Sequence, residues 1–392
     1  MMGQGKTSAM INFIKKSDEN THFLFITPYL EEVDRIIESC PNKQFKQPEK
    51  FGTKLKGIKH LLRNKQNIVS THVLFSYFDD EVAKLIKDGN YILIMDEVAN
   101  VVDKCVITEY DSATILDRYA SIGDDGKVNW EVNDYTGKLS EYKAAAKSGC
   151  LRYYKGNTWL WIFPIDVFKA FEDIYIMTYM FEAQIQKYYF DLFDIKYKNV
   201  YISGDNIDNY CITNEEVKYN YRDLRSLIHI CDNQKMNEIG DNKFALSKRW
   251  YEKSVRTKYV QILKNHCYNF FRHQAQTKSE YNLWTTFKEY QKKLSGSGYA
   301  KGFLSCNSRA TNKYKERVAV AYLINRFLDP NVKQYFTERG IEVNEDKYAL
   351  SEMLQFIWRS AVRDGQEVWL YIPSRRMRNL LIDWLDERGD EN

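Results

Sequence analysis

The chain is 392 residues long, which is enough for two domains of ordinary size, each with its own buried core. Its 57 Lys and Arg residues nearly balance 53 Asp and Glu residues, so any basic nucleic-acid surface must be a local patch. Its 7 cysteines are scattered without a C-x-x-C pair, which argues against a disulfide framework or a zinc site. With no signal-peptide core and no long apolar run, the sequence predicts a reducing, cytoplasmic setting and no membrane partner.

The first predicted elements alternate between helix and strand. Apolar residues recur at helical spacing from Thr7 to Lys16, and short apolar runs of strand type follow, the first of them ended by Pro28. The predicted strands are His22–Thr27, Ile68–Ser70, Tyr91–Met95 and Ile174–Thr178. Continuous apolar runs are typical of strands that helices bury on both faces. The alternation predicts an α/β fold with parallel sheets.

Between about residues 105 and 160 this alternation breaks down. The pattern there predicts a turn at 123–126, a short Ala-rich helix over 138–147 and a hairpin turn at 155–157. We interpret this segment as an insertion in the first domain. By position it is a candidate for separating strands or docking a partner.

A second α/β set occupies the C-terminal half. Its predicted strands are Ser226–Ile230, Gly302–Ser305 and Glu367–Ile372. A polar stretch over about 195–225 predicts the boundary, which we place so that the domains are 1–205 and 206–392.

The sharpest chemical signal is a phosphate-binding loop at the start of the chain. In G-x-x-x-x-G-K-[ST], backbone N–H groups surround the phosphates, the lysine reaches the β and γ oxygens, and the hydroxyl holds Mg²⁺. Lys6 and Thr7 fit the last two positions, and the helix that follows directs its positive end at the anion. The predicted nucleotide-binding residues are Gly3, Gln4, Gly5, Lys6, Thr7 and Ser8.

This loop is incomplete in the sequence. Its first glycine would precede Met1, and the strand that should lead into it is absent. The pattern therefore indicates an N-terminally truncated loop, and a chain that truly starts at Met1 would bind nucleotide weakly. A chance G-K-T remains the alternative.

A pair of carboxylates follows the strand Tyr91–Met95. At the end of a strand, Asp96 can hold the hydrated magnesium ion, with Thr7 as the other metal ligand, and Glu97 can act as general base for the attacking water. The alternative is an acidic helix start. Two independent pieces in the right order favour the nucleotide interpretation.

Three polar residues occur at helical spacing near the end of the chain. Gln355, Arg359 and Arg363 lie at i, i+4 and i+8, which places them on one face of a predicted helix. Arginines bind phosphate oxygens through a rigid fork of donors. The apolar neighbours predict a largely buried helix, where arginines would need an anionic partner.

Taken in order, these motifs resemble motifs I, II, III and VI of the superfamily-2 DEAD/DEAH-like helicases, most closely the compact helicases of bacteriophages and mobile elements. The motifs are Gly5-Lys6-Thr7, Asp96-Glu97-Val98-Ala99, Thr178-Tyr179 and Gln355-x-x-x-Arg359-x-x-x-Arg363. The resemblance covers nearly the whole chain. It implies two RecA-like lobes that bind ATP and Mg²⁺ between them, with Glu97, Gln355, Arg359 and Arg363 as catalytic residues.

The resemblance also implies coupling and nucleic-acid-binding residues. Thr178 and Tyr179 would couple hydrolysis to movement, although Tyr179 replaces the small residue usual in motif III. Residues that would hold the sugar-phosphate backbone without reading sequence are Thr27, Pro28, Thr71, His72, Thr285, Arg309, Thr311 and Asn312.

The function that these features predict is an ATP-dependent DNA helicase or translocase in phage or mobile-element replication. Its expected partners are single-stranded or tailed duplex DNA and replication proteins in a bacterial cytoplasm, with RNA left open. Two alternatives stay open: a translocase that does not separate strands, and a truncated nucleic-acid-binding module that does not hydrolyse ATP.

Overall fold

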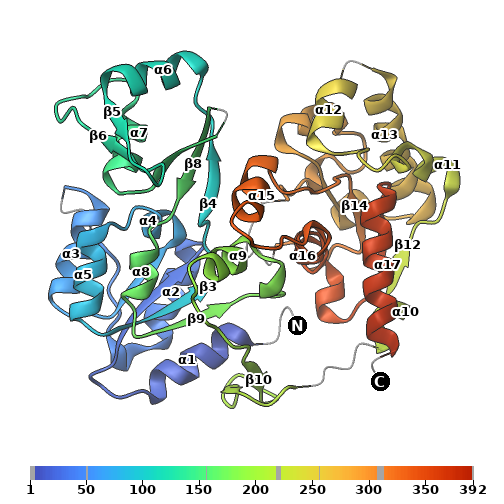
Figure 1. Ribbon diagram of the computed structural model, residues 1–392. Coiled ribbons are helices and arrows are strands. Elements are labelled where there is room, and N and C mark those ends of the chain that lie inside the picture. The colour runs from blue at the N-terminus through green and yellow to red at the C-terminus, as the bar shows by residue number, and fades with distance from the viewer. Residues whose placement is uncertain are drawn as a thin grey trace. The chain divides into compact units, whose positions relative to one another are not determined.

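The computed structural model describes residues 5–49, 52–155, 157–217, 222–255, 257–306 and 313–390, which divide into two compact units (Figure 1). The first unit runs to Val217 and also takes in Asp329–Val343, and the second holds the rest. The division therefore falls after the hairpin β10 (Tyr201–Ser203) and β11 (Cys211–Thr213), later than residue 205. The hairpin stays with the first unit because Ile212 packs into that unit's core.

A four-stranded parallel sheet forms the centre of the first unit. Its order is β2 (Ile68–Thr71), β1 (His22–Thr27), β3 (Tyr91–Asp96) and β9 (Asp173–Met177). Each strand matches a predicted one to within a residue at either end. β1 is buried from Phe23 to Thr27, as expected for an apolar run covered on both faces. The predicted α/β fold with a parallel sheet is confirmed.

Helices cover this sheet. They are α1 (Lys6–Lys16), α2 (Leu30–Ser39), α3 (Lys54–Arg63), α4 (His72–Phe75), α5 (Asp80–Asp88), α8 (Ile165–Lys169) and α9 (Ile185–Leu192). Two of them start at side-chain caps, since Thr53 accepts from the Lys56 N–H and Asp79 accepts from the Val82 N–H. Helix α1 differs from these two helices, because its N-cap is Gly5 and no side chain caps it.

The insertion is a small antiparallel subdomain on the first unit. Its elements are β4 (Val102–Cys105), α6 (Glu109–Arg118), β5 (Ala120–Ile122), β6 (Val128–Trp130), α7 (Ser140–Lys147), β7 (Leu151–Tyr154) and β8 (Thr158–Ile162). β8 lies between β4 and β7, and β5 pairs with β6, so the predicted hairpin, turn and helix are all present. Figure 1 shows α6, α7 and the β5–β6 pair gathered at one end of β4 and β8. Trp159 and Leu151 lie in its separate apolar core.

A segment from the C-terminal half completes the first unit. Helix α15 (Pro330–Thr337) packs on α9 and β4. Phe336 is fully buried with its ring 6.0 Å from that of Tyr188, and Tyr335 lies 5.9 Å from Tyr154 of the insertion. Glu338 accepts hydrogen bonds from the Tyr154 hydroxyl and the Lys155 ammonium group.

The second unit has a parallel sheet of its own. Its order is β12 (Ile228–Ile230), β15 (Val368–Tyr371), β14 (Ala319–Tyr322) and β13 (Asn282–Thr285). Its helices are α10 (Arg222–Leu227), α11 (Gln234–Asn237), α12 (Lys248–Ser254), α13 (Lys258–Asn269), α14 (Gln291–Leu294), α16 (Glu345–Ile357) and α17 (Arg375–Asp390). The chain thus has two α/β units, each with a parallel sheet, and an insertion in the first unit, which matches the predicted fold class.

In this unit one strand prediction is wrong, and another begins two residues too early. Residues 226 and 227 end α10, so the first strand begins only at Ile228. No strand covers 302–305: Gly302 ends a 3-10 turn, and Phe303 makes a single bridge to Trp284. An added Cβ on Gly302 would lie 2.0 Å from the Asn282 carbonyl oxygen, so the chain packs on β13 here rather than extending the sheet. The strands β13 and β14 were missed.

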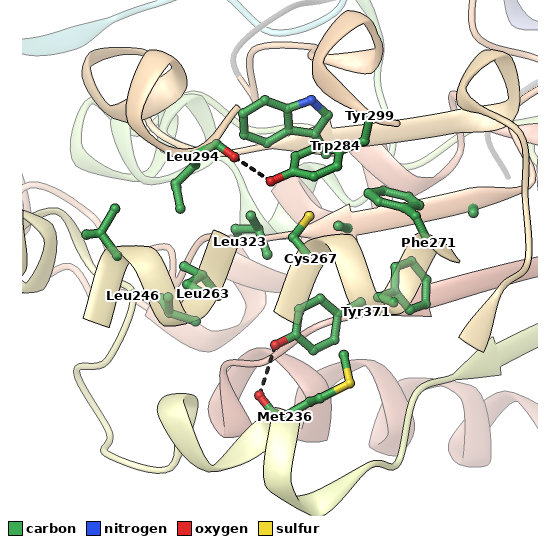
Figure 2. Close-up of a cluster of buried hydrophobic side chains, with 14 of the residues drawn as sticks. Met236, Leu246, Leu263, Cys267, Phe271, Trp284, Leu294, Tyr299, Leu323 and Tyr371 are labelled. Atoms are coloured by element: carbon green, nitrogen blue, oxygen red, sulfur yellow. Dashed lines mark hydrogen bonds between the residues drawn. The ribbon is translucent and has the colours of Figure 1, made fainter. Parts of the chain in front are cut away.

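Aromatic and aliphatic side chains fill the core of the second unit (Figure 2). Trp284, Tyr299 and Tyr371 are fully buried there. Both tyrosine hydroxyls have acceptors, since Tyr299 donates to the Leu294 carbonyl at 2.5 Å and Tyr371 to the Met236 carbonyl at 2.9 Å. These hydrogen bonds compensate for the water that the hydroxyls lose on burial.

Candidate active site

The sheet of the first unit brings four of the predicted segments to one edge. Because its strands are parallel, their carboxyl ends lie together. Thr27 ends β1 and is paired in register with Thr71 at the end of β2. Asp96 ends β3 and is paired with Met177, the residue before Thr178. Residues far apart in sequence thus meet at this edge.

The start of α1 carries the described part of the phosphate loop. Gly5 has a φ of 71°, a left-handed conformation that favours glycine, and an added Cβ would lie 2.4 Å from the Tyr210 ring. Lys6 and Thr7 are half-buried, and Ser8 is buried. Gly3 and Gln4 lie outside the described residues. The contact with Tyr210 was missed, because no motif marks that tyrosine.

Asp96 is electrostatically unusual. Burial raises its pKa to about 7, and the negative charges of Glu97 and Glu32 act in the same direction. The positive charges of Lys6 and Arg35 oppose this shift. The structure therefore places the predicted lysine and the predicted metal-binding carboxylate within electrostatic reach of each other.

Glu97 adopts a strained backbone and makes specific contacts. Its φ is 69°, which is unfavourable for a residue with a side chain. Its N–H donates to the Met177 carbonyl at 3.2 Å, and its carboxylate oxygen Oε2 accepts from the Thr178 hydroxyl at 3.2 Å. The predicted general base and the predicted coupling residue are thus in direct contact. Tyr179, the other predicted coupling residue, is half-buried.

His72 connects the end of β2 to the carboxylate strand. Its Nε2 lies 2.7 Å from the Asp96 carbonyl oxygen, so this nitrogen is the donor. Thr71 and Pro28 are half-buried beside this edge. No motif indicates the link between His72 and Asp96, because His72 begins α4 directly after β2 whereas Asp96 ends β3.

Two of the predicted nucleic-acid contacts have buried side chains. Thr27 and Thr285 are fully buried, and the hydroxyl of neither has a hydrogen-bond partner among the residues that the structure describes. In this arrangement neither hydroxyl reaches the surface. Arg309, Thr311 and Asn312 lie outside the described residues.

The prediction that three residues share one helix face is wrong. Helix α16 ends at Ile357, so it contains Gln355 but neither arginine. Arg359 lies in the following turn, and Arg363 is exposed in the 3-10 helix η8 (Ala361–Asp364). Beyond the C-cap residue Trp358, Ser360 is extended, and its hydroxyl donates to the Ile357 carbonyl at 2.6 Å.

Among the described residues, no group of three or more His, Cys, Asp or Glu side chains could hold a metal ion, and no helix is long and apolar enough to cross a membrane. All seven cysteines are described and are free thiols.

Comparisons with known proteins identify relatives of the chain. Residues 222–385 match the model of the YonV C-terminal Rossmann-like domain. The chain is 41% identical to the SPbeta prophage-derived uncharacterized protein YonV of Bacillus subtilis (strain 168), with 99% of this chain and 98% of that protein covered. A solved structure titled XPD helicase aligns with a TM-score of 0.44 and 10% identity over 99% of this chain and 94% of that chain. From the 41% identity over nearly its full length, the chain belongs to the YonV family.

Proposed function

We propose that the protein hydrolyses ATP at the carboxyl edge of the first unit's sheet and uses the hydrolysis to move along nucleic acid. The observation that carries this proposal is the contact between the Thr178 hydroxyl and Glu97. Glu97 directly follows Asp96, whose pKa is raised by burial and partly lowered again by the positive charge of Lys6. Helix α1 thus supplies the phosphate-binding pattern, and the residues after β3 and β9 supply a carboxylate, Glu97, that a hydrogen bond from Thr178 orients.

The residues present fit a magnesium nucleotide. The first N–H groups of α1 have no side-chain cap, and such groups together with the helix dipole favour an anion. Asp96 has a raised pKa, which a nearby cation would lower again. Lys6 would contact the phosphates, and Thr7 with Asp96 would hold the metal. When bound, Mg²⁺ supplies positive charge that offsets the charge on the phosphate oxygens.

Glu97 has the position of a general base. One carboxylate oxygen, Oε2, accepts from Thr178, which leaves Oε1 for a water molecule. Because Thr178 directly follows β9, a movement of that segment would change the orientation of the base. This contact gives the proposed coupling residue a physical route to the hydrolysis step.

The proposed substrate track is DNA, single-stranded or as a tailed duplex. The hydrogen bond from His72 to the Asp96 carbonyl gives a second route between the predicted nucleic-acid segment and the site. The relative's origin in a prophage supports a role in phage DNA replication. Whether RNA serves as the track instead of DNA is decided by the experiment below.

Hydrolysis tests the proposal most directly. The purified protein should hydrolyse ATP faster when single-stranded DNA is added, and Lys6→Ala should abolish most of that rate. Lys16→Ala is the matched control, since Lys16 is an exposed residue at the other end of the same helix. An unchanged rate in Lys6→Ala would show that this site does not hydrolyse ATP.

A labelled duplex with a single-stranded tail distinguishes the related activities. Release of the labelled strand with ATP identifies a helicase. DNA-stimulated hydrolysis without release identifies a translocase that does not separate strands. DNA binding without hydrolysis identifies a binding module, and stimulation by RNA alone would replace DNA as the track.

A further inference from the structure

Gln186 contacts the loop that carries the two carboxylates. It lies in the first turn of α9, is fully buried, and its Oε1 accepts a hydrogen bond of 2.8 Å from the Ala99 N–H. Ala99 follows Glu97 by two residues and is itself buried. A buried amide side chain therefore fixes the chain directly after the proposed general base.

The conformation of this loop needs such support. Glu97 has a left-handed φ of 69°, and strained backbone persists only where the surroundings hold it. Three contacts come from one segment of chain: the Met177 carbonyl, the Thr178 hydroxyl and Gln186. The first two hold Glu97 itself, and only Gln186 holds the loop beyond it among these three.

The two polar atoms of the Gln186 amide are used unequally. Among the described residues, the Nε2 of Gln186 is buried without a hydrogen-bond partner. A buried donor without a partner is unfavourable, but an apolar side chain at this position would leave the buried Ala99 N–H without its acceptor. The side chain is therefore present for its oxygen.

We infer that Gln186 is a positioning residue: by accepting from the Ala99 N–H, it holds Glu97 in the orientation in which its carboxylate can take a proton from the attacking water. Because this role rests on the proposed ATP hydrolysis, its test must separate a failure of the role from a failure of that function.

Two substitutions at this position separate shape from hydrogen bonding. Gln186→Met keeps the length of the side chain but removes the acceptor. Gln186→Glu keeps an acceptor oxygen and replaces the unpartnered amide nitrogen with a second oxygen, and burial at this position favours the neutral, protonated carboxyl group. Tyr189→Phe is the matched control, since Tyr189 is on the same helix, is fully buried, and loses one hydrogen bond of 2.5 Å to the Phe163 carbonyl.

The measurements are steady-state ATP hydrolysis with single-stranded DNA and hydrogen exchange of the Ala99 amide. Gln186→Met should lower kcat about tenfold with KM for ATP within about twofold, because the phosphate-binding residues are untouched, and should speed exchange at Ala99. Gln186→Glu should recover most of kcat. Tyr189→Phe should leave kcat and the exchange at Ala99 unchanged.

Several results would overturn the role of Gln186. An unchanged kcat in Gln186→Met, with an active wild type, would show that the contact is not needed for hydrolysis. Equal losses in Gln186→Met and Tyr189→Phe would indicate general destabilisation instead. A wild type that hydrolyses no ATP overturns the proposed function first, and unchanged exchange at Ala99 in Gln186→Met would then reject the positioning contact as well.

Discussion

The two units differ in whether the fold brings their predicted functional residues together. In the first unit, residues from separate strands meet at one edge, where Thr178 contacts Glu97 and His72 contacts the Asp96 carbonyl. In the second unit, Gln355 and Arg359 were expected on one helix face, but α16 ends between them. Predicted residues that follow parallel strands thus lie at one edge of the sheet, whereas the residues at helical spacing do not share one helix face.

The reason lies in what each pattern depends on. A parallel sheet places the carboxyl ends of all its strands at one edge, whatever the loops between them do. A spacing of four residues places side chains together only while the helix continues. Here α16 ends at Ile357, between Gln355 and Arg359, so the spacing no longer brings the two side chains together.

The largest effect should come from the carboxylate of the first unit. Glu97→Gln should lower ATP hydrolysis by about 10²–10⁴-fold, the usual contribution of a general base, while nucleotide binding is retained. Hydrolysis rates and binding of a fluorescent ATP analogue measure the two effects. Glu32→Gln is the control: it removes a negative charge that also acts on Asp96, and its rate should stay within about twofold. Equal losses in both variants would mean that the local charge matters and the base does not.

A smaller effect should distinguish the two arginines of the second unit. The Nη1 of Arg359 is buried, whereas Arg363 is exposed. Arg359→Ala should therefore lower the free energy of unfolding by about 1–2 kcal/mol, and Arg363→Ala should change it by less than about 0.5 kcal/mol. Urea denaturation checks this. Similar losses of stability and of hydrolysis in both variants would restore the view that they act from one surface.

Strain at the first unit's edge should be measurable by itself. Glu97→Gly should be more stable than Glu97→Ala by about 0.5–1 kcal/mol, because a left-handed φ costs an alanine more than the extra flexibility of unfolded glycine costs. The same pair of substitutions at Glu32, inside helix α2, should give the opposite order. Thermal unfolding without nucleotide is a suitable measurement, and alanine as the more stable residue at both positions would argue against strain at Glu97.

The smallest effect concerns the segment that the C-terminal half contributes to the first unit. Hydrogen bonds from Tyr154, Gln334 and Lys155 lower the pKa of Glu338 to about 2. A carboxyl whose pKa is lower in the folded state stabilises the protein above the unfolded value near 4.5, and this contribution is lost as the pH falls toward 2. The stability difference between wild type and Glu338→Gln should thus be present at pH 6 and smaller at pH 3.

The hydrogen bond from the Tyr154 hydroxyl is the largest cause of this lowered pKa. Urea denaturation at both pH values should therefore give a smaller pH-dependent difference when the same comparison is made in a Tyr154→Phe background. A difference that does not vary with pH would show that Glu338 makes no such contact in solution.

Much of the fold could be predicted from the sequence. The strands β1, β3 and β15 are short apolar runs, and periodicity identifies them directly. Strand β13 was missed because Asn282 and Thr285 flank only two apolar residues, whereas β14 lies in the continuous apolar run over 318–324, which was overlooked although periodicity could have identified it. Residues 302–305 looked like a strand, yet the close approach of Gly302 to the Asn282 carbonyl depends on packing that no local pattern reveals.

The site was predictable only where a motif marks it. Lys6, Asp96 and Glu97 belong to recognisable patterns. Gln186 and Tyr210 act through contacts with residues 87 and 205 positions away, and no spacing rule connects positions so distant.

The return of Asp329–Val343 to the first unit has a consequence for how the protein is made. During synthesis the first unit emerges from the ribosome long before α15 does, and until then the rings of Tyr188 and Tyr154 lack the partners Phe336 and Tyr335. The first unit therefore finishes folding only after most of the second has been translated. An N-terminal fragment ending near Val217 should be soluble only if this apolar surface is covered in another way.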